Sequence, residues 1–271
     1  MDLQFFWRKF FVSNSFFTII FLLFELNSLL GKIEPPLYIR SHAFDYSSGK
    51  YLYSENHYEY YEKGSHTHSI IFYRTPGEKD FAKKKIEFFR RKTQPDFLLE
   101  DFRTGYYDKA QLKNPAEQIF YVEHRRSANK QVKKKLLQIP GVVVVDGGFD
   151  YFIRENFDRI NNGEMMKGNF LLVNRQDYFL CRVKKHSDIL YKGREAMELH
   201  IMPDNFFIRQ IADKLVVIYD KKSKRLLEYI GISNLQNDAA DDFPKVRIIF
   251  QYKPDQLDSI WNESESEIIQ Q

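Results

Sequence analysis

Cysteine, proline and glycine are scarce in this chain of 271 residues, which contains one Cys, 9 Pro and 12 Gly. A single cysteine excludes an intramolecular disulfide and any zinc or iron–sulfur site built from several cysteines. The fold must therefore be stabilised by packing. Cys181 lies in the apolar stretch DYFLCRV, and such a position predicts a buried, unreactive thiol.

A strong charge of one sign is also missing. The chain has 41 basic and 37 acidic residues, and its formal net charge of +4 is small for a protein that binds nucleic acid. Short basic runs occur at residues 83–85, 90–92, 125–126 and 133–135. These runs predict solvated faces or protected strand edges, with contact to anionic lipid or polysaccharide as the alternative. We expect no nucleic acid partner.

The signature motifs of the common enzyme classes are absent. The sequence has no G-x-S-x-G, H-E-x-x-H, G-x-x-x-x-G-K-[ST] or G-x-G-x-x-G. Neighbouring carboxylates, as at residues 241–242, are adjacent rather than facing, which gives acid/base hydrolysis no support. The pattern predicts no catalytic residue and no cofactor. No carboxylate at a telling spacing accompanies four histidines, which are expected to be surface or core residues: His42, His124, His186 and His200.

No apolar run is long enough to cross a bilayer. Arg8 and Lys9 precede an apolar run of nine residues, 16–24, interrupted only by Thr18. This length suits a signal peptide and falls short of the roughly 20 residues of a membrane span. We predict that residues 1–31 are an export signal and that the protein is periplasmic. The alternative is an uncleaved anchor in the inner membrane, which would be the chain's sole membrane association.

Aromatic residues, by contrast, are abundant: 25 Phe, 17 Tyr and 2 Trp. Eight of the Phe lie in residues 1–31, and all 17 Tyr lie beyond them, mostly in short runs bounded by turn residues. Such runs predict an all-β fold, mainly antiparallel, with a curved sheet or partial barrel. We expect one domain over residues 32–253 and a polar tail over 254–271. The expected strands are residues 37–44, 50–61, 66–74, 81–91, 97–104, 118–126, 131–139, 142–145, 168–173, 178–185, 198–202, 214–219, 225–233 and 245–252.

Two hairpins and one helix can be placed. Turns are expected at Lys63–Gly64, where glycine supplies a positive φ, and over residues 221–224. Apolar residues at 149, 152, 153, 157 and 160 share one face of a short amphipathic helix near 149–162. Asp146 is the expected N-cap and Gly163 the expected C-cap. Residues 147–148 are interpreted as a tight turn into this helix, which should cover the sheet.

A candidate metal site comes from the first hairpin. With the turn at Lys63–Gly64, opposed residue numbers sum to 127, which pairs position 59 with 68, 61 with 66, and 57 with 70. Side chains two apart share a strand face, so four residues would gather on one side: His57, Glu59, His66 and His68. Imidazoles with a carboxylate can bind zinc or copper. The alternative is a solvent-facing polar end of the hairpin.

Three stretches carry a resemblance to known proteins. They are LEDFRTGYYDKAQ (99–111), VVVVDGGFDYFIRENFD (142–158) and YDKKSKRLLEYIGISN (219–234). Together they resemble exported, β-rich bacterial proteins of uncharacterised function, and the last stretch loosely resembles the periplasmic lipoprotein-carrier superfamily. That resemblance implies a curved antiparallel sheet around a hydrophobic cavity closed by helices. It assigns no site residue.

The pattern as a whole predicts an exported, non-enzymatic envelope protein that binds an apolar or amphipathic ligand, such as a lipid, in an aromatic-lined concavity. One alternative is a structural or protein-interaction module with a solid core. Another is a metal-dependent enzyme that uses the histidine-rich hairpin face. A pocket near the ~300 Å³ of ordinary ligand sites separates the first two hypotheses.

Overall fold

The computed structural model describes residues 35–205 and 214–258. The chain divides after Pro35, and the architecture below belongs to the unit that begins at Pro36. The predicted export signal, residues 1–31, lies outside the described residues, as do residues 259–271 of the predicted tail. None of the helices in the described ranges has the length and hydropathy that a membrane span requires.

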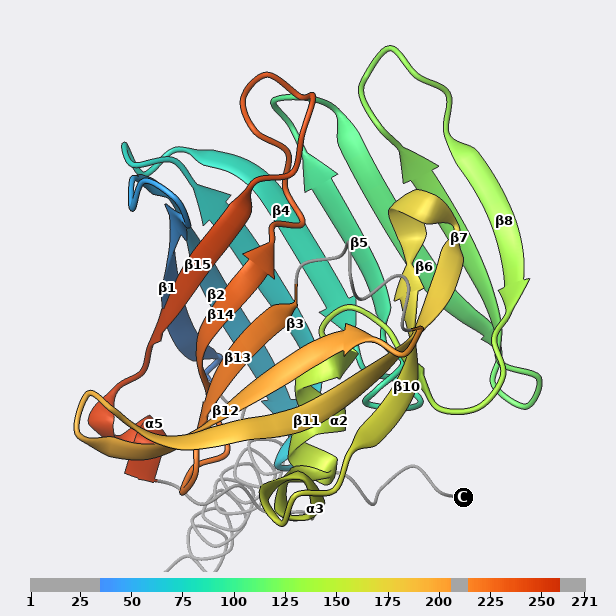
Figure 1. The fold of residues 1–271 in the computed structure, drawn as a ribbon. Helices are drawn as coiled ribbons and strands as arrows, with labels where there is room; N and C mark the ends of the chain where they lie inside the picture. The colour runs from blue at the N-terminus through green and yellow to red at the C-terminus, as the bar shows by residue number, and fades with distance from the viewer. Residues whose placement is uncertain (1–34, 206–213, 259–271) are drawn as a thin grey trace, which may run out of the picture. The chain divides into compact units, whose positions relative to one another are not determined.

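Fifteen strands form a single sheet (Figure 1). They are β1 (Leu37–Asp45), β2 (Tyr51–Glu62), β3 (Ser65–Arg74), β4 (Asp80–Glu87), β5 (Asp96–Asp101), β6 (Tyr106–Asn114), β7 (Ile119–Arg125), β8 (Lys133–Gln138), β9 (Val143–Val144), β10 (Met166–Leu172), β11 (Asp177–Tyr191), β12 (Arg194–Pro203), β13 (Leu215–Asp220), β14 (Leu226–Ile232) and β15 (Lys245–Gln251). The helical segments are α2 (Gly148–Glu155), α3 (Phe157–Asn161), η1 (Val173–Arg175) and α5 (Pro254–Asp258).

The strand order explains how the sheet is built. Strands β1 to β8 run in sequence order to one side, and β15 back to β9 run to the other, so the first and last strands are neighbours in the middle. In Figure 1 the blue β1 lies beside the red β15. Each adjacent pair is antiparallel except β9 and β10, which are parallel. The end strands β8 and β9 do not pair, so the sheet is not closed.

The sheet curves around helix α2. Tyr151 of α2 hydrogen-bonds His66 of β3, and Asp150 of the same helix accepts a hydrogen bond from Tyr219 of β13. Strands β3 and β13 lie on opposite sides of the central β1–β15 pair. One short helix can reach both only if the sheet is curved, which confirms the predicted curved, mainly antiparallel all-β fold. We call the face that contacts α2 the inner face and the other the outer face.

Strand prediction was wrong mainly at β6 and β11. The segment YYDKAQLKN of β6 was not predicted because it is polar, although it alternates buried and half-buried positions and buries Asp108. Strand β11 runs from Asp177 to Tyr191 rather than ending at residue 185. The run of polar residues 184–188 hides this extension, which pairs with β12 through a bulge after Lys185. Beyond the bulge, Ile189 and Tyr191 pack against a small apolar cluster.

The predicted helix near 149–162 is confirmed, but as two pieces that meet at Asn156. Asp146 is not its N-cap, which corrects that prediction. The cap position is Gly147, and Asp146 instead has a φ of 39° and binds Lys84. The turn into the helix needs glycine for space, since a Cβ on Gly148 would lie 2.3 Å from the carbonyl oxygen of Thr93. The C-cap of α3 is Asn162 rather than the predicted Gly163, which follows it with a φ of 92°.

The first hairpin turns where the sequence predicts, at Lys63 and Gly64, both with positive φ. Its register changes at a bulge between Tyr60 and Tyr61. Tyr61 opposes His66 as expected, but beyond the bulge Tyr60, not Glu59, opposes His68. The predicted pairing of Glu59 with His68 is therefore wrong by one residue, and one residue in a strand exchanges the two faces.

Candidate functional site

A cavity of about 560 Å³ lies on the inner face of the sheet. Its lining comes from β1–β4 on one side, from β10–β15 on the other, and from β9 and α2 between them. The volume lies within the range of ordinary small-molecule sites, roughly 300–1,000 Å³. The cavity required by the predicted ligand-binding fold is therefore present.

Most of the cavity wall is apolar and rich in aromatic rings. The rings come from β3, α2, β10, β14 and β15 and from the residue that follows β4, and aliphatic side chains from β1, β3, β4 and β12–β15 complete the wall. The aromatic part includes Phe88, Phe149, Phe170, Phe250, Tyr73 and Tyr229. Burial of an apolar ligand surface here would contribute about 25 cal/mol per Å² removed from water.

A band of ionisable side chains crosses this apolar wall. Alternation along β2 places Glu55, His57 and Glu59 on the inner face, and all three line the cavity. The Glu55 carboxylate accepts hydrogen bonds from Ser41 Oγ at 3.0 Å and from His57 Nε2 at 3.1 Å. Burial raises the pKa of Glu55, but the hydrogen bonds from His57 and Ser41 outweigh it and leave that pKa lowered. Glu55 is therefore a buried carboxylate.

Lys84 is the middle residue of the basic run in β4 and points inward, whereas its neighbours lie on the other face. Its ammonium lies 2.8 and 3.0 Å from the two carboxylate oxygens of Asp146, and only 5% of the residue is exposed. The prediction that this run is a solvated face is thus wrong for Lys84. The left-handed backbone at Asp146 directs the carboxylate into the cavity, where the ion pair compensates the burial of both charges.

Helix α2 contributes a second ion pair. Arg154 lies one turn after Asp150, and their charged groups are 2.6 Å apart. Burial raises the pKa of Asp150, and the nearby Arg154 guanidinium opposes that rise. Burial lowers the pKa of Arg154, but the carboxylates of Asp150 and Glu59 outweigh it and leave the pKa raised. Glu59 accepts a hydrogen bond from Tyr61 at 3.0 Å, and none of the described cations lies within ion-pair distance of it.

His66 is held by hydrogen bonds at both ring nitrogens. Nδ1 lies 2.8 Å from the Tyr151 hydroxyl and Nε2 lies 2.8 Å from Ser69 Oγ. The residue is 5% exposed, and burial lowers its pKa to about 4. His66 is therefore a neutral, fully partnered ring at pH 7, and neither nitrogen is free for a metal.

The structure brings three of the four predicted metal ligands to one face. His57, Glu59 and His66 line the cavity, whereas His68 lies on the outer face, stacked on Tyr60 with ring centroids 4.3 Å apart. The bulge at Tyr60 and Tyr61 causes this separation. The hairpin therefore does not assemble all four residues on one side.

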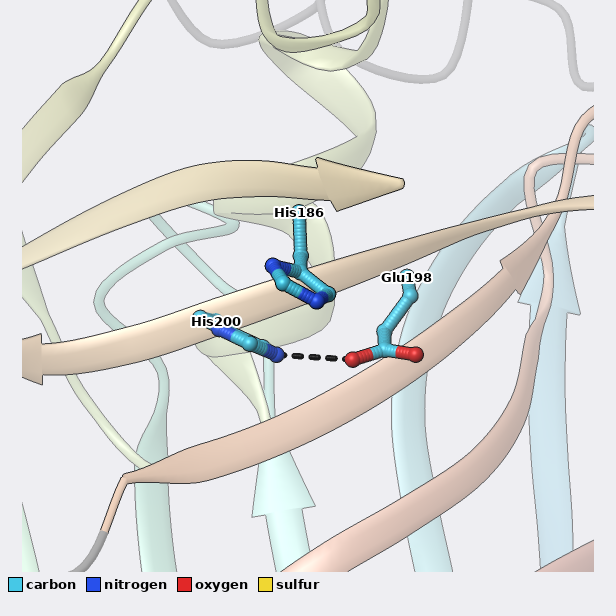
Figure 2. Close-up of side chains that lie close together, drawn as sticks. All are labelled: His186, Glu198 and His200. Atoms are coloured by element: carbon cyan, nitrogen blue, oxygen red, sulfur yellow. Dashed lines mark hydrogen bonds and ion pairs between the residues drawn. The ribbon is translucent and has the colours of Figure 1, made fainter. Parts of the chain in front are cut away.

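A different trio of ligand-type residues gathers on β11 and β12. His186, Glu198 and His200 offer ligand atoms that all lie within 4.8 Å of one another (Figure 2). Glu198 and His200 are two residues apart on one strand, and their side chains are 2.7 Å apart. The expectation that His200 lacks a paired carboxylate is therefore wrong, and it is wrong for His124 too, whose Nδ1 lies 2.7 Å from the Asp108 carboxylate. The i, i+2 rule applied to Glu198 and His200 could have found the pair.

The lone thiol also lies at the cavity. Cys181 of β11 is half-buried and lines the pocket. Burial, with a smaller contribution from Asp204, raises the pKa of its thiol to about 11. The thiol is therefore protonated at pH 7, but it is half-buried at the cavity rather than buried as the surrounding sequence predicts.

No protein-family model and no curated protein matches the chain. Among solved structures it is similar to a beta-barrel-like protein of a domain of unknown function, DUF1849, from Brucella abortus. The identity is 7% and the TM-score 0.45, over 80% of this chain and 98% of that one. It is also similar to a DUF1329 family protein from Desulfovibrio piger ATCC 29098, with 14% identity and a TM-score of 0.25, over 83% and 86%.

A third similar structure is described as an outer membrane lipoprotein-sorting protein domain from Vibrio parahaemolyticus. Its identity is 10% and its TM-score 0.25, over 82% of this chain and 87% of that one. Two of these structures are assigned to domains of unknown function and the third is described as a lipoprotein-sorting domain, the two kinds of protein that the sequence resembles. With TM-scores below 0.5, these likenesses carry no argument about the ligand, which has to be argued from the cavity.

Proposed function

We propose that this protein is an exported envelope protein that binds an apolar or amphipathic ligand, such as a lipid, in the cavity and catalyses no reaction. The cavity of about 560 Å³ carries the proposal. Its largely apolar wall favours an aliphatic or aromatic ligand, and the ionisable band favours a ligand with one polar end. A module with a solid core would have no such space.

The excess of carboxylates in the ionisable band indicates which charge the polar end of the ligand can carry. Four carboxylates line the cavity, Glu55, Glu59, Asp146 and Asp150, against two cations, Lys84 and Arg154. Both cations are already engaged in ion pairs. We therefore propose a ligand whose polar end is cationic or uncharged rather than anionic.

Engagement of the ionisable groups with one another supports a binding role over catalysis. Lys84, Arg154 and His66 each hold protein partners. A general acid or base needs to reach the proton of a substrate. The predicted export signal, residues 1–31, is the basis for proposing a periplasmic location, with inner-membrane anchoring as the alternative if the segment is not cleaved.

Binding is tested first by native mass spectrometry and solvent extraction of the purified full chain, and then with N-phenyl-1-naphthylamine as an apolar fluorescent probe. We expect probe fluorescence to rise on binding and to fall when dodecylamine or dodecanol competes. Ile71→Trp places a large ring in the cavity and should abolish probe binding. Its control is Ile70→Trp, on the outer face of the same strand. Absence of probe binding in the wild-type chain would overturn the proposed function.

The charge of the polar end has its own test. Dodecanoate should displace the probe at higher concentrations than dodecylamine does, because its carboxylate would approach Glu59. Glu59→Gln removes one negative charge without changing the shape of the side chain, and should reduce this difference. Equal or tighter competition by dodecanoate in the wild-type chain would contradict the cationic or uncharged end while leaving the binding function standing.

A further inference from the structure

The hairpin of β11 and β12 carries a second group of polar residues that the proposed function does not use. His186 sits at the bulge between Lys185 and Ser187, where the pairing of β11 with β12 skips one residue. The bulge turns His186 to the side of Glu198 and His200, so that its ring stacks on His200 with centroids 4.0 Å apart and planes 16° apart. Figure 2 shows the three side chains converging.

This trio lies on the outer face. Met197 and Leu199 of β12 belong to the core cluster formed with α2 and α3, and alternation therefore directs Glu198 and His200 away from it. None of the three residues lines the cavity. His186 is exposed, Glu198 is partly exposed and His200 is buried. Solvent therefore reaches the group at His186, whereas His200 is held by the surrounding protein.

The ring nitrogens of His186 are available, unlike those of His66. Within residues 35–205 and 214–258, neither nitrogen of His186 has a hydrogen-bond partner. His200 uses Nε2 for Glu198 at 2.7 Å.

We propose that His186, Glu198 and His200 bind one divalent transition-metal ion, with Zn²⁺ as the reference, through two imidazoles and one carboxylate. Ligands about 2.0–2.1 Å from a tetrahedral Zn²⁺ lie about 3.3 Å apart. The spacing of 2.7 Å between Glu198 and His200 would widen slightly, and the exposed His186 ring can turn to close the third side. Three protein ligands leave a fourth position open to water or to a ligand.

Two imidazoles with one carboxylate select the class of ion. Imidazole suits zinc, copper and nickel, whereas calcium and magnesium require sets of oxygen ligands. A plain surface ion pair of Glu198 and His200 with a stacked second ring is the competing explanation, and it needs no metal.

The test uses the full chain without a histidine tag, freed of metal by chelation and titrated with ZnCl₂ by isothermal calorimetry. We expect one equivalent of Zn²⁺, and His186→Ala and Glu198→Gln should each weaken binding at least about tenfold. His186 is exposed, so its loss should not unfold the protein. Co²⁺ should give the visible absorption bands of a four-coordinate ion in the wild type and not in His186→Ala. Mg²⁺ should not compete.

His124 serves as a matched control. It pairs with the Asp108 carboxylate at 2.7 Å, but among the described residues the two are not joined by a third metal-binding side chain. His124→Ala should leave the Zn²⁺ titration unchanged. Zn²⁺ binding that survives His186→Ala at full strength, or no saturable binding by the wild type, would overturn the proposed site. Neither result would bear on probe binding in the cavity, so this proposal and the proposed function fail separately.

Discussion

Histidines and carboxylates gather at two places in the described residues, on the inner face of the β2–β3 hairpin and on the outer face of the β11–β12 hairpin. In the inner group the nitrogens of His66 are bonded to Tyr151 and Ser69, and His57 is bonded to Glu55. In the outer group His186 has only a ring contact among the described residues. Residue types alone do not distinguish these groups. The partners of the ring nitrogens do, because a saturated nitrogen is structural and a free one can bind a metal.

The comparison also shows what burial does to polar groups. The inner group is surrounded by apolar walls, so each charge there needs a partner within the protein. The outer group is exposed at one side, where water can satisfy an unpartnered nitrogen. An inner group held by mutual pairing should therefore be sensitive to the loss of one member, and an outer group should not.

The largest effect is expected for Lys84→Ala. Its removal leaves the Asp146 carboxylate at the cavity without its cation, and loss of one partner of a buried ion pair costs about 3–5 kcal/mol. The free energy of unfolding is measured by urea denaturation at pH 7. Lys85→Ala is the control, because Lys85 is exposed and its pair with Glu87 lies at the surface. Its loss should cost less than about 1 kcal/mol. Equal costs for the two variants would contradict the inner pairing.

A smaller effect, spread over pH, is expected from His66. The pKa of this ring is about 4 in the folded chain, against 6.5 for an ordinary histidine. Between these values the unfolded chain binds a proton that the folded chain does not, so the free energy of unfolding falls as the pH falls. The shift of 2.5 units corresponds to roughly 3 kcal/mol, lost progressively between about pH 6.5 and pH 4.

The surroundings of His66 explain why its pKa is lowered rather than raised. Burial and the cations Lys92 and Arg154 lower its pKa, and the Glu59 carboxylate raises it by a smaller amount. His66→Gln should remove most of this dependence in urea denaturation measured at several pH values. The control His68→Gln should keep it, because His68 lies on the outer face. A slope unchanged by His66→Gln would show that another group titrates there.

Most of the fold can be predicted from the sequence because each strand has a recognisable pattern in its own short stretch of residues. Alternating apolar residues and turn signals such as Lys63–Gly64 locate nearly all the strands, and the apolar spacing from 149 to 160 locates the helix. Strand β6 was not predicted because it is polar and buries Asp108. Burial of this carboxylate depends on hydrogen bonds from Tyr106 and His124, which form only in the folded sheet. The central pairing of β1 with β15 joins residues some 200 positions apart, and no local pattern specifies it.

The candidate sites are less predictable because bulges determine them. The sequence correctly places His57, Glu59 and His66 near one another, but the bulge at Tyr60 and Tyr61 moves His68 to the other face. The bulge at His186 does the reverse and adds a histidine to the Glu198–His200 pair. A shift of one residue exchanges faces. Lys84 and Asp146 are 62 positions apart, and their pairing depends on the curvature of the whole sheet.

The smallest effect is expected for His68→Ala. Its ring stacks on Tyr60 on the outer face at a centroid distance of 4.3 Å, and a stacked pair of this kind contributes about 0.5–1.5 kcal/mol. We expect a loss at the low end in urea denaturation, because the ring is partly exposed. The same variant tests the predicted hairpin metal site, since His68 lies away from His57, Glu59 and His66. Zn²⁺ binding should be unchanged in His68→Ala. A reduced Zn²⁺ stoichiometry would show that the first hairpin binds metal and would contradict this expectation.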